Sequence, residues 1–208
     1  MIKLLGIPFD IKFTLVVIFG TVVPMLDWYG HRITPNKSYD RFILYFVIPV
    51  ILLLLFRENL GDFGLKWGNW REGLMWTVGV CLVMGVILWF LADTPEMAKY
   101  YTRVAKNRPI SLILFDNMVE MFAWEFVWRG FTLFAMARLI GSGPAIAVQA
   151  IPFAFMHLGK PEFETLTTIF GGIGFGIIAW RTDSMLYPFF IHWFMVAFTM
   201  LRATGRFG

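Results

Sequence analysis

Long apolar runs, separated by short polar segments, dominate the chain from end to end. Most of these runs are about 15–22 residues long, the length that an α-helix needs to cross a bilayer. They lack the alternating pattern of about ten residues that marks the strands of an outer-membrane barrel. The pattern therefore predicts an all-α fold, a polytopic transmembrane helix bundle. About seven spanning helices are expected, near residues 11–28, 42–56, 73–92, 110–139, 142–158, 163–180 and 185–201.

The polar segments between the runs predict loops and short helices at the membrane surface. Residues 30–40 have a turn-forming composition, so His31 is interpreted as a loop histidine. Arg41 and Arg57 bracket the second run, and both side chains are expected to extend toward the membrane surfaces. Short interfacial helices are expected in two segments that mix charged, glycine and apolar residues, 58–72 and 93–108.

The run at residues 110–139 is too long for one perpendicular span. It is expected to be strongly tilted, kinked or divided near residues 124–130. Its polar side chains fall on two faces of a helix, which lie about 140° apart at about 100° per residue. One face carries Asp116, Glu120 and Trp124, and the other carries Glu125 and Arg129. A helix that is polar on two sides suits the interior of a bundle.

Glycines in the sixth run predict a close contact between two helices. Gly172 and Gly176 are four residues apart, so both lie on one side of a helix. Small residues at this spacing let a second helix approach closely.

Composition agrees with the membrane prediction. The chain of 208 residues is 58% hydrophobic and 15% charged, whereas soluble domains carry about 25% charged residues. The mean hydropathy is +0.68. We therefore expect a multi-pass integral protein of the cell membrane, surrounded by the lipid bilayer. The net charge is +4 and the basic residues are spread over short segments, which favours anionic lipid head groups over nucleic acid as their counterpart.

The organisation of the chain is expected to be simple. No repeat, linker or low-complexity segment divides it, so a single domain over residues 1–208 is predicted, with its motifs within about residues 60–201. The N-terminal residues lack a small-residue cleavage site, so a removable signal peptide is not expected. Cys81, the single cysteine, is interpreted as a core residue, and no internal disulfide is possible.

Charged residues inside the apolar runs mark the candidate functional site. Glu125 and Arg129 lie one helical turn apart in strongly apolar sequence. A charge at membrane depth costs about 2.5–3.5 kcal/mol on insertion scales, so such a residue needs a partner or a function. His157 and His192 also lie in apolar runs, and the three regions are predicted to converge. A purely structural ion pair between Glu125 and Arg129 is the alternative.

These residue types favour hydrolysis of an acyl bond without a covalent intermediate. A carboxylate and an imidazole that share a water can act as a general base, and a second imidazole can donate to the oxyanion. A serine or cysteine nucleophile is disfavoured, because the chain has no Gly-x-Ser-x-Gly motif and Cys81 is far from the charged motif in sequence. His157, His192 and a carboxylate could bind zinc, but no His-Glu-x-x-His motif supports this. Neither a metal nor a cofactor is predicted.

Three motifs, taken together, resemble those of a known family. The chain contains Trp124-Glu125-x-x-x-Arg129, then Phe153-x-x-x-His157, then His192-x-x-x-Val196. Their order is similar to the Glu-Glu-x-x-x-Arg, Phe-x-x-x-His and His-x-x-x-Asn motifs of the CPBP family of intramembrane proteases. That family contains the type II CAAX prenyl endopeptidases and bacterial relatives linked to bacteriocin processing. The chain departs from the pattern at Trp124, in place of the first glutamate, and at Val196, in place of the asparagine.

The resemblance implies a role for each motif residue. Glu125 with His157 would activate water, His192 would stabilise the oxyanion, and Arg129 would position or neutralise the acid. Glu120 is a rival acid, because it lies one turn before Trp124 on the same face. The substrate site is expected to be lined by Glu120, Trp124, Phe153 and Val196.

The leading prediction is an endopeptidase that cuts a membrane-associated peptide or protein near the bilayer. One alternative is an inactive CPBP-like protein that binds a membrane peptide or a partner. A small transporter with Glu125 and the histidines as a proton relay is a third possibility. Against it, the sequence has no paired inverted halves.

Overall fold

The computed structural model describes residues 2–30, 32–105 and 108–207, and it confirms the all-α membrane class. His31, interpreted above as a loop histidine, lies outside these ranges. A short antiparallel hairpin of β1 (Ile2–Leu4) and β2 (Ile7–Phe9) precedes the helices. Within the described ranges, five helical stretches are long and apolar enough to cross a membrane. They are α1 (Ile11–Trp28), the stretch Lys37–Leu55, α4 (Trp70–Leu91), α9 (Glu162–Thr182) and α10 (Leu186–Ala203).

The second spanning stretch begins earlier than the apolar run alone indicated. It consists of α2 (Lys37–Phe42), the π-helical η1 (Ile43–Val47) and α3 (Ile48–Leu55). The side chain of Asn36 caps α2 by accepting a hydrogen bond from the backbone of Ser38, as helix N-caps do. The polar residues 37–41 therefore belong to the helix and not to the preceding loop.

Arg41 does not extend toward the membrane surface, as its position at the start of an apolar run had suggested. Its Nε donates to the Asp27 carboxylate at 2.9 Å, and its Nη1 pairs with Glu120. Asp27 lies at the end of α1 and is only 5% exposed. Two acids on neighbouring helices thus hold the guanidinium inside the protein, and this pairing replaces its contact with water. Arg57 is exposed, as expected.

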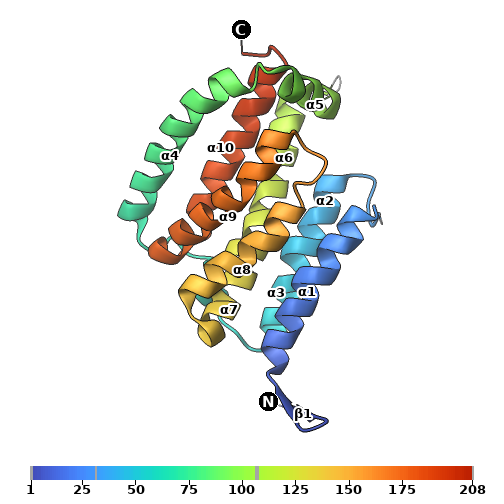
Figure 1. Ribbon diagram of the computed structural model, residues 1–208, viewed down its shortest axis with the longest axis vertical. Helices are drawn as coiled ribbons and strands as arrows, with labels where there is room; N and C mark the ends of the chain where they lie inside the picture. The colour runs from blue at the N-terminus through green and yellow to red at the C-terminus, as the bar shows by residue number, and fades with distance from the viewer. Residues whose placement is uncertain (1, 31, 106–107, 208) are drawn as a thin grey trace.

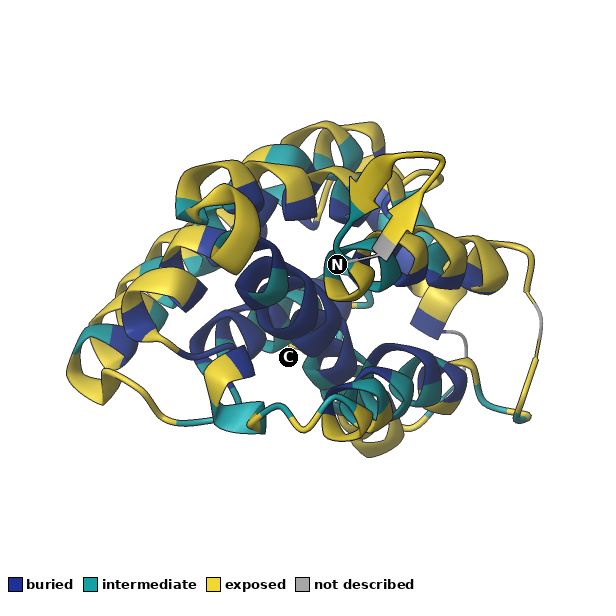
Figure 2. Ribbon diagram, turned by 90° about the horizontal axis from the view of Figure 1, so that it is seen from below, coloured by how far each residue is buried: buried dark blue, intermediate teal, exposed yellow. Residues whose placement is uncertain are grey.

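The long polar run forms one continuous helical element through the middle of the molecule. It consists of α6 (Ile110–Glu125), the π-helical η3 (Phe126–Thr132) and α7 (Leu133–Ile140). The helix changes to π-helix directly after Glu125, within the segment 124–130 where the run was expected to be tilted, kinked or divided. Every residue of η3 is buried. Figure 2 shows the buried residues gathered at the middle of the molecule, with exposed residues on the outward sides of the surrounding helices.

The predicted close contact of two helices is confirmed between α8 (Ser142–Phe155) and α9. A Cβ atom added to Gly172 would lie 3.0 Å from both the Ala150 Cβ and the Phe153 ring. At Gly176 it would lie 2.8 Å from the Gln149 side-chain nitrogen. A side chain at either position would displace these neighbours, so the two glycines allow the helices to lie this close.

The helix α5 (Pro95–Ala105) lies across one end of the bundle, near the C-terminus, and α4 lies at the outer edge beside α10 (Figure 1). Met97, Tyr101 and Ala105 are the buried residues of α5. They are four residues apart, so they form one stripe on an otherwise polar helix. This confirms the predicted amphipathic helix. The other predicted interfacial segment, residues 58–72, contains η2 (Leu60–Phe63), a single 3-10 turn.

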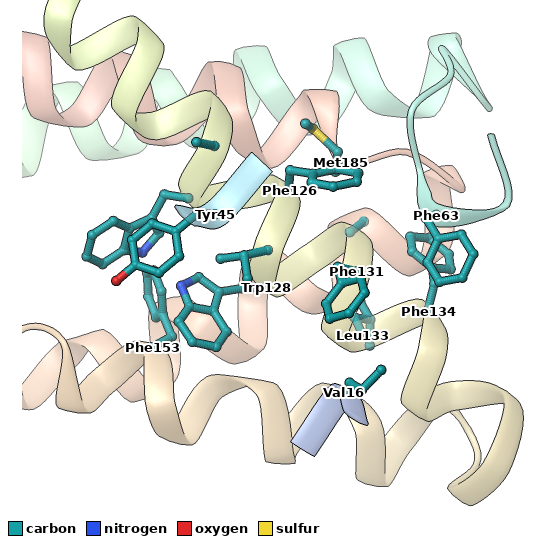
Figure 3. Packing of buried hydrophobic residues seen from close by; sticks show 14 of the residues in the cluster. Val16, Tyr45, Phe63, Phe126, Trp128, Phe131, Leu133, Phe134, Phe153 and Met185 are labelled. Carbon is teal, nitrogen blue, oxygen red and sulfur yellow. The ribbon is translucent and has the colours of Figure 1, made fainter. Parts of the chain in front are cut away.

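Aromatic residues fill the core around η3. Figure 3 shows Tyr45 of η1 and Trp128 of η3 next to one another, and their ring centroids are 6.4 Å apart. The Tyr45 hydroxyl donates to Asp27 at 3.1 Å. The core therefore continues directly into the buried charges of α1 and α2.

Candidate active site

Glu125 and Arg129 lie at the junction of α6 and η3, and both side chains are 0% exposed. Glu125 Oε1 accepts a hydrogen bond from Arg129 Nη1 at 3.1 Å. The same oxygen pairs with His192 Nδ1 at 2.6 Å. One buried carboxylate oxygen therefore joins the arginine of its own helix to the histidine of α10.

The remainder of the Arg129 guanidinium lies among aromatic rings. Its central carbon is 3.9 Å from the ring centroid of Phe153 and 5.2 Å from that of Phe175. Its Nη2 donates to the Gly172 carbonyl at 3.5 Å. Gly172 has no side chain, which leaves this carbonyl accessible from the core. One carboxylate, one carbonyl and two ring faces thus surround this buried cation. Its Nε has no hydrogen-bond partner among the described residues.

His192 lies on α10, one turn after Pro188, and is 6% exposed. The ionised form of Glu125 can only accept hydrogen bonds, so with that form Nδ1 is the donor and carries the proton. Within the described part of the chain, Nε2 is then the free ring nitrogen. A carboxylate at Nδ1 fixes the ring orientation and stabilises the charged imidazolium.

His157 follows the end of α8 and is 4% exposed. Its Nδ1 lies 2.9 Å from the Phe153 carbonyl oxygen, an acceptor only, so Nδ1 carries the proton here too. The ring centroid of Phe153 is 4.8 Å from that of His157 and 5.8 Å from that of His192. Phe153 therefore lies against both imidazoles and against Arg129. Glu125 itself bonds to His192 and not, as the resemblance had implied, to His157.

Two pockets meet at these histidines, and His157 and His192 line both. The first, of about 440 Å³, is apolar and is lined by residues of α4, α5, α9 and α10. It includes Phe153 and Val196, both expected to line a substrate site. The second, of about 350 Å³, is rich in charged residues and includes Glu120 and Trp124, the other two lining candidates.

The rival acid Glu120 lies in the polar pocket, whereas Glu125 lines neither pocket. Arg41 and the Ser38 hydroxyl, at 3.0 Å, hold the Glu120 carboxylate. The Arg41 guanidinium carbon is also 4.9 Å from the Trp124 ring centroid. The two polar faces predicted for this helix therefore carry two separate charged groups, one around Glu120 and one around Glu125.

Asp116, on the same face as Glu120, is 2% exposed and lines neither of the two pockets at the histidines. It pairs with Arg108, and the side-chain amide of Asn36 donates to it at 3.3 Å. Asp116 therefore connects α6 to the N-terminus of α2 and to residue 108.

The sequence interpretation missed the contribution of the N-terminal helices to the polar pocket. Asp27, Lys37 and Arg41 all line it. An acid at the end of one apolar run and a base at the start of the next were a usable signal, because oppositely charged residues near membrane depth pair with one another. The described residues contain no group of three or more histidine, cysteine, aspartate or glutamate side chains arranged to hold a metal ion.

Apolar spanning helices around a buried carboxylate, a guanidinium and two imidazoles define a multi-pass membrane protein with a polar site inside its bundle. Residues 106–198 match the family model described as type II CAAX prenyl endopeptidase Rce1-like. This match confirms the resemblance to the CPBP family of intramembrane proteases, and at the family level it supports a protease of that type. No curated protein and no solved structure matches the chain.

Proposed function

We propose that the protein is an intramembrane endopeptidase of the cell membrane that hydrolyses a peptide bond near the bilayer with histidine-activated water. One observation carries this proposal: His157 and His192 line a polar and an apolar pocket together, each with its Nδ1 already bonded. A hydrolase inside a membrane needs water and an apolar substrate at the same catalytic groups, and this arrangement supplies both.

His157 is the proposed general base. Its Nδ1–H donates to a neutral carbonyl, so Nε2 keeps a lone pair that can accept a proton from water. The hydroxide formed attacks the carbonyl carbon of the peptide bond. General bases of this kind contribute about 10²–10⁴-fold to the rate.

His192 is the proposed donor to the oxyanion. The adjacent Glu125 carboxylate, at 2.6 Å, stabilises the imidazolium, whose Nε2–H then donates to the oxygen that gains negative charge. Glu125 thus acts through His192 and is a positioning residue, since it lines neither pocket. Arg129 lowers the cost of burying that carboxylate.

The reaction is completed when protonated His157 gives its proton to the leaving nitrogen and the C–N bond breaks. The products are a carboxylic acid and an amine, and both imidazoles return to their starting states. The polar pocket on the Glu120 side would supply the water.

A second function, an inactive protein that binds a membrane peptide, is favoured by Trp124. This residue occupies the first acidic position of the family motif, and its indole lies in the wall of the polar pocket. The ring centroids of Trp124 and His157 are 6.0 Å apart. In this case the charged and histidine side chains would have a structural role only, in maintaining the shape of the pockets.

Peptide cleavage in proteoliposomes tests the proposal. His157→Ala and His192→Ala should each lower kcat by about a hundredfold or more, because they remove the base and the oxyanion donor. Peptide affinity should change little. Cleavage that is unaffected by both changes would overturn the mechanism, and wild-type protein that binds peptides without cutting them would support the binding function.

A further inference from the structure

The pockets on the two sides of the histidines differ in the chemistry that they can bind. Apolar side chains of α4 and α9, such as Val80, Met84 and Phe163, line the larger pocket. The spanning window of α4 is only 6% buried, so this wall of the pocket borders the lipid. An apolar ligand can therefore approach His157 and His192 from within the bilayer.

The polar pocket carries more positive than negative side chains. Its basic residues are Lys37, Arg41, Arg103 and Lys160, and its acids are Asp27 and Glu120. Arg41 is committed to both acids, and Lys37 Nζ is 3.5 Å from an Asp27 oxygen. Lys160 pairs with Glu164 at 2.7 Å, outside this pocket.

Arg103 is the cation best placed to bind a ligand. It lies on the exposed side of α5, and its guanidinium carbon is 5.4 Å from the Tyr100 ring centroid. Within the described ranges it has no carboxylate partner, although it lines the polar pocket. The Lys37 side chain, 51% exposed, also lines the pocket and can exchange its long contact with Asp27 for a closer anion.

We propose that the substrate is a peptide that occupies both pockets, with an apolar segment on the α4 and α9 side and carboxylate-bearing residues in the polar pocket. The scissile bond would then lie at His157 and His192. This inference rests on the proposed function and adds the class of substrate to it. Charge complementarity supports it, because the excess cations attract carboxylates into a partly enclosed site where water screens charge less.

A binding measurement in nanodiscs of neutral phosphatidylcholine tests this without requiring cleavage. The probe is a fluorescent peptide with an apolar leucine and alanine segment followed by Ser-Glu-Glu, with an amidated C-terminus. The comparison peptides end in Ser-Gln-Gln and Ser-Lys-Lys. The acidic peptide should bind about threefold to tenfold more tightly than the glutamine peptide, from two partly exposed charge contacts. The lysine peptide should bind most weakly.

A further arm separates two sources of the carboxylate. Both gains are measured against the amidated glutamine peptide. If the pocket binds a terminal carboxylate, the glutamine peptide with a free C-terminus should bind more tightly. If the pocket binds side-chain carboxylates, the amidated acidic peptide should bind more tightly. A gain in either arm supports the proposal and identifies the source. Equal affinity of all the peptides overturns it.

Arg103→Gln and Lys37→Gln should each weaken binding of the acidic peptide by about twofold to fivefold and leave the glutamine peptide unchanged. Arg71→Gln is the matched control, because Arg71 also lies over a ring, Trp70 at 5.5 Å, but lines neither pocket. An equal loss in the control, or no loss in either pocket variant, overturns the assignment of the cations.

Photo-crosslinking tests the direction of binding. A diazirine in the apolar segment should label α4 and α9, and one beside the glutamates should label α2 and α5. Reversed labelling, or labelling of lipid alone, overturns the proposal. A peptide that binds with this charge preference but is never cut supports the pocket assignment and refutes hydrolysis. A peptide that is cut without charge preference supports hydrolysis and refutes the pocket assignment.

Discussion

Glu125 and Glu120 lie on the same helix, and each is paired with an arginine, but their surroundings differ. The Glu125 and Arg129 side chains are both 0% exposed, whereas Glu120 is 15% and Arg41 18% exposed. Glu125 binds His192 and lines neither of the two pockets at the histidines, whereas Glu120 lines the polar pocket and is bonded to Ser38 and Arg41. The two acids therefore differ in burial: Glu125 is enclosed and bonded to an imidazole, whereas Glu120 is accessible from the polar pocket.

This difference shows how one helix can carry two charged groups with different tasks. Glu125 lies five positions after Glu120 on the helix, so the two carboxylates face different neighbours. Glu125 and Arg129 contact residues of α8, α9 and α10, whereas Glu120 is held by α2, whose Arg41 also binds Asp27 of α1. Substitutions in the two groups should therefore have effects of different kind and size.

The largest effect is expected for Arg129→Leu. It leaves Glu125 buried beside a histidine that is charged only when protonated, and breaking a buried ion pair costs about 3–5 kcal/mol of folding free energy. Thermal unfolding of the purified protein, followed by tryptophan fluorescence, should show a markedly lower Tm.

Arg41→Leu is the comparison for this variant. Water can reach Asp27 and Glu120 from the polar pocket, so the loss should be smaller. Equal losses of Tm in the two variants would contradict the expected difference between the fully buried Glu125–Arg129 pair and the partly exposed Glu120–Arg41 pair.

Glu125→Gln should lower kcat about a hundredfold and leave KM nearly unchanged. The amide can still accept a hydrogen bond from His192, but it carries no charge to stabilise the imidazolium. Steady-state kinetics in proteoliposomes measure both constants. A rise in KM alone would instead place Glu125 in substrate binding, and the retention of peptide affinity would show that the variant is folded.

Glu120→Gln should have a smaller effect, about tenfold or less in kcat/KM, and mainly through KM. The change weakens one contact of Arg41 at the edge of the pocket, while His157 and His192 keep their own hydrogen bonds. The same kinetic assay checks it. If this variant lost as much kcat as Glu125→Gln, Glu120 would be the working acid.

The smallest effect is expected at Glu58, outside the spanning helices, where hydrogen bonds from Lys12 and then Arg138 hold the pKa of the carboxyl below its ordinary 4.5. A lowered pKa in the folded protein adds stability above pH 4.5, and this is lost as the pH falls through the folded pKa. Tm measured against pH should therefore fall less steeply on acidification for Glu58→Gln than for wild type. Glu96→Gln on α5 is the control, and identical curves for Glu58→Gln and wild type would contradict the prediction.

Much of the fold could be predicted because each spanning helix is encoded in its own stretch of sequence. The run 11–28 was predicted with the bounds that α1 has. About seven spans were predicted. Within the described ranges, five stretches have the length and composition of a span. The apolar α8 has only 14 residues, and α6, η3 and α7 carry several charges. The prediction of a single domain over residues 1–208 stays a prediction.

The convergence of the motif residues could be predicted from the sequence, but their contacts could not. The motif spacing identified Glu125, Arg129, His157 and His192, and the ion pair within one helix follows from the helical repeat. The choice of His192 over His157 as the partner of Glu125 depends on how α8 and α10 pack. Arg41 and Glu120 are 79 residues apart, and no local pattern encodes such a contact.

The pairing of Arg41 with Asp27 also bears on how the chain enters the membrane during synthesis. The two residues belong to the first pair of spanning helices, so the guanidinium meets an acid before α6 and its glutamates have left the ribosome. Arg129 likewise has Glu125 four residues ahead of it. Arg41 and Arg129 thus each have an acidic partner that is translated earlier. The first two spanning stretches, α1 and Lys37–Leu55, can therefore insert with Arg41 already neutralised, before the later helices are made.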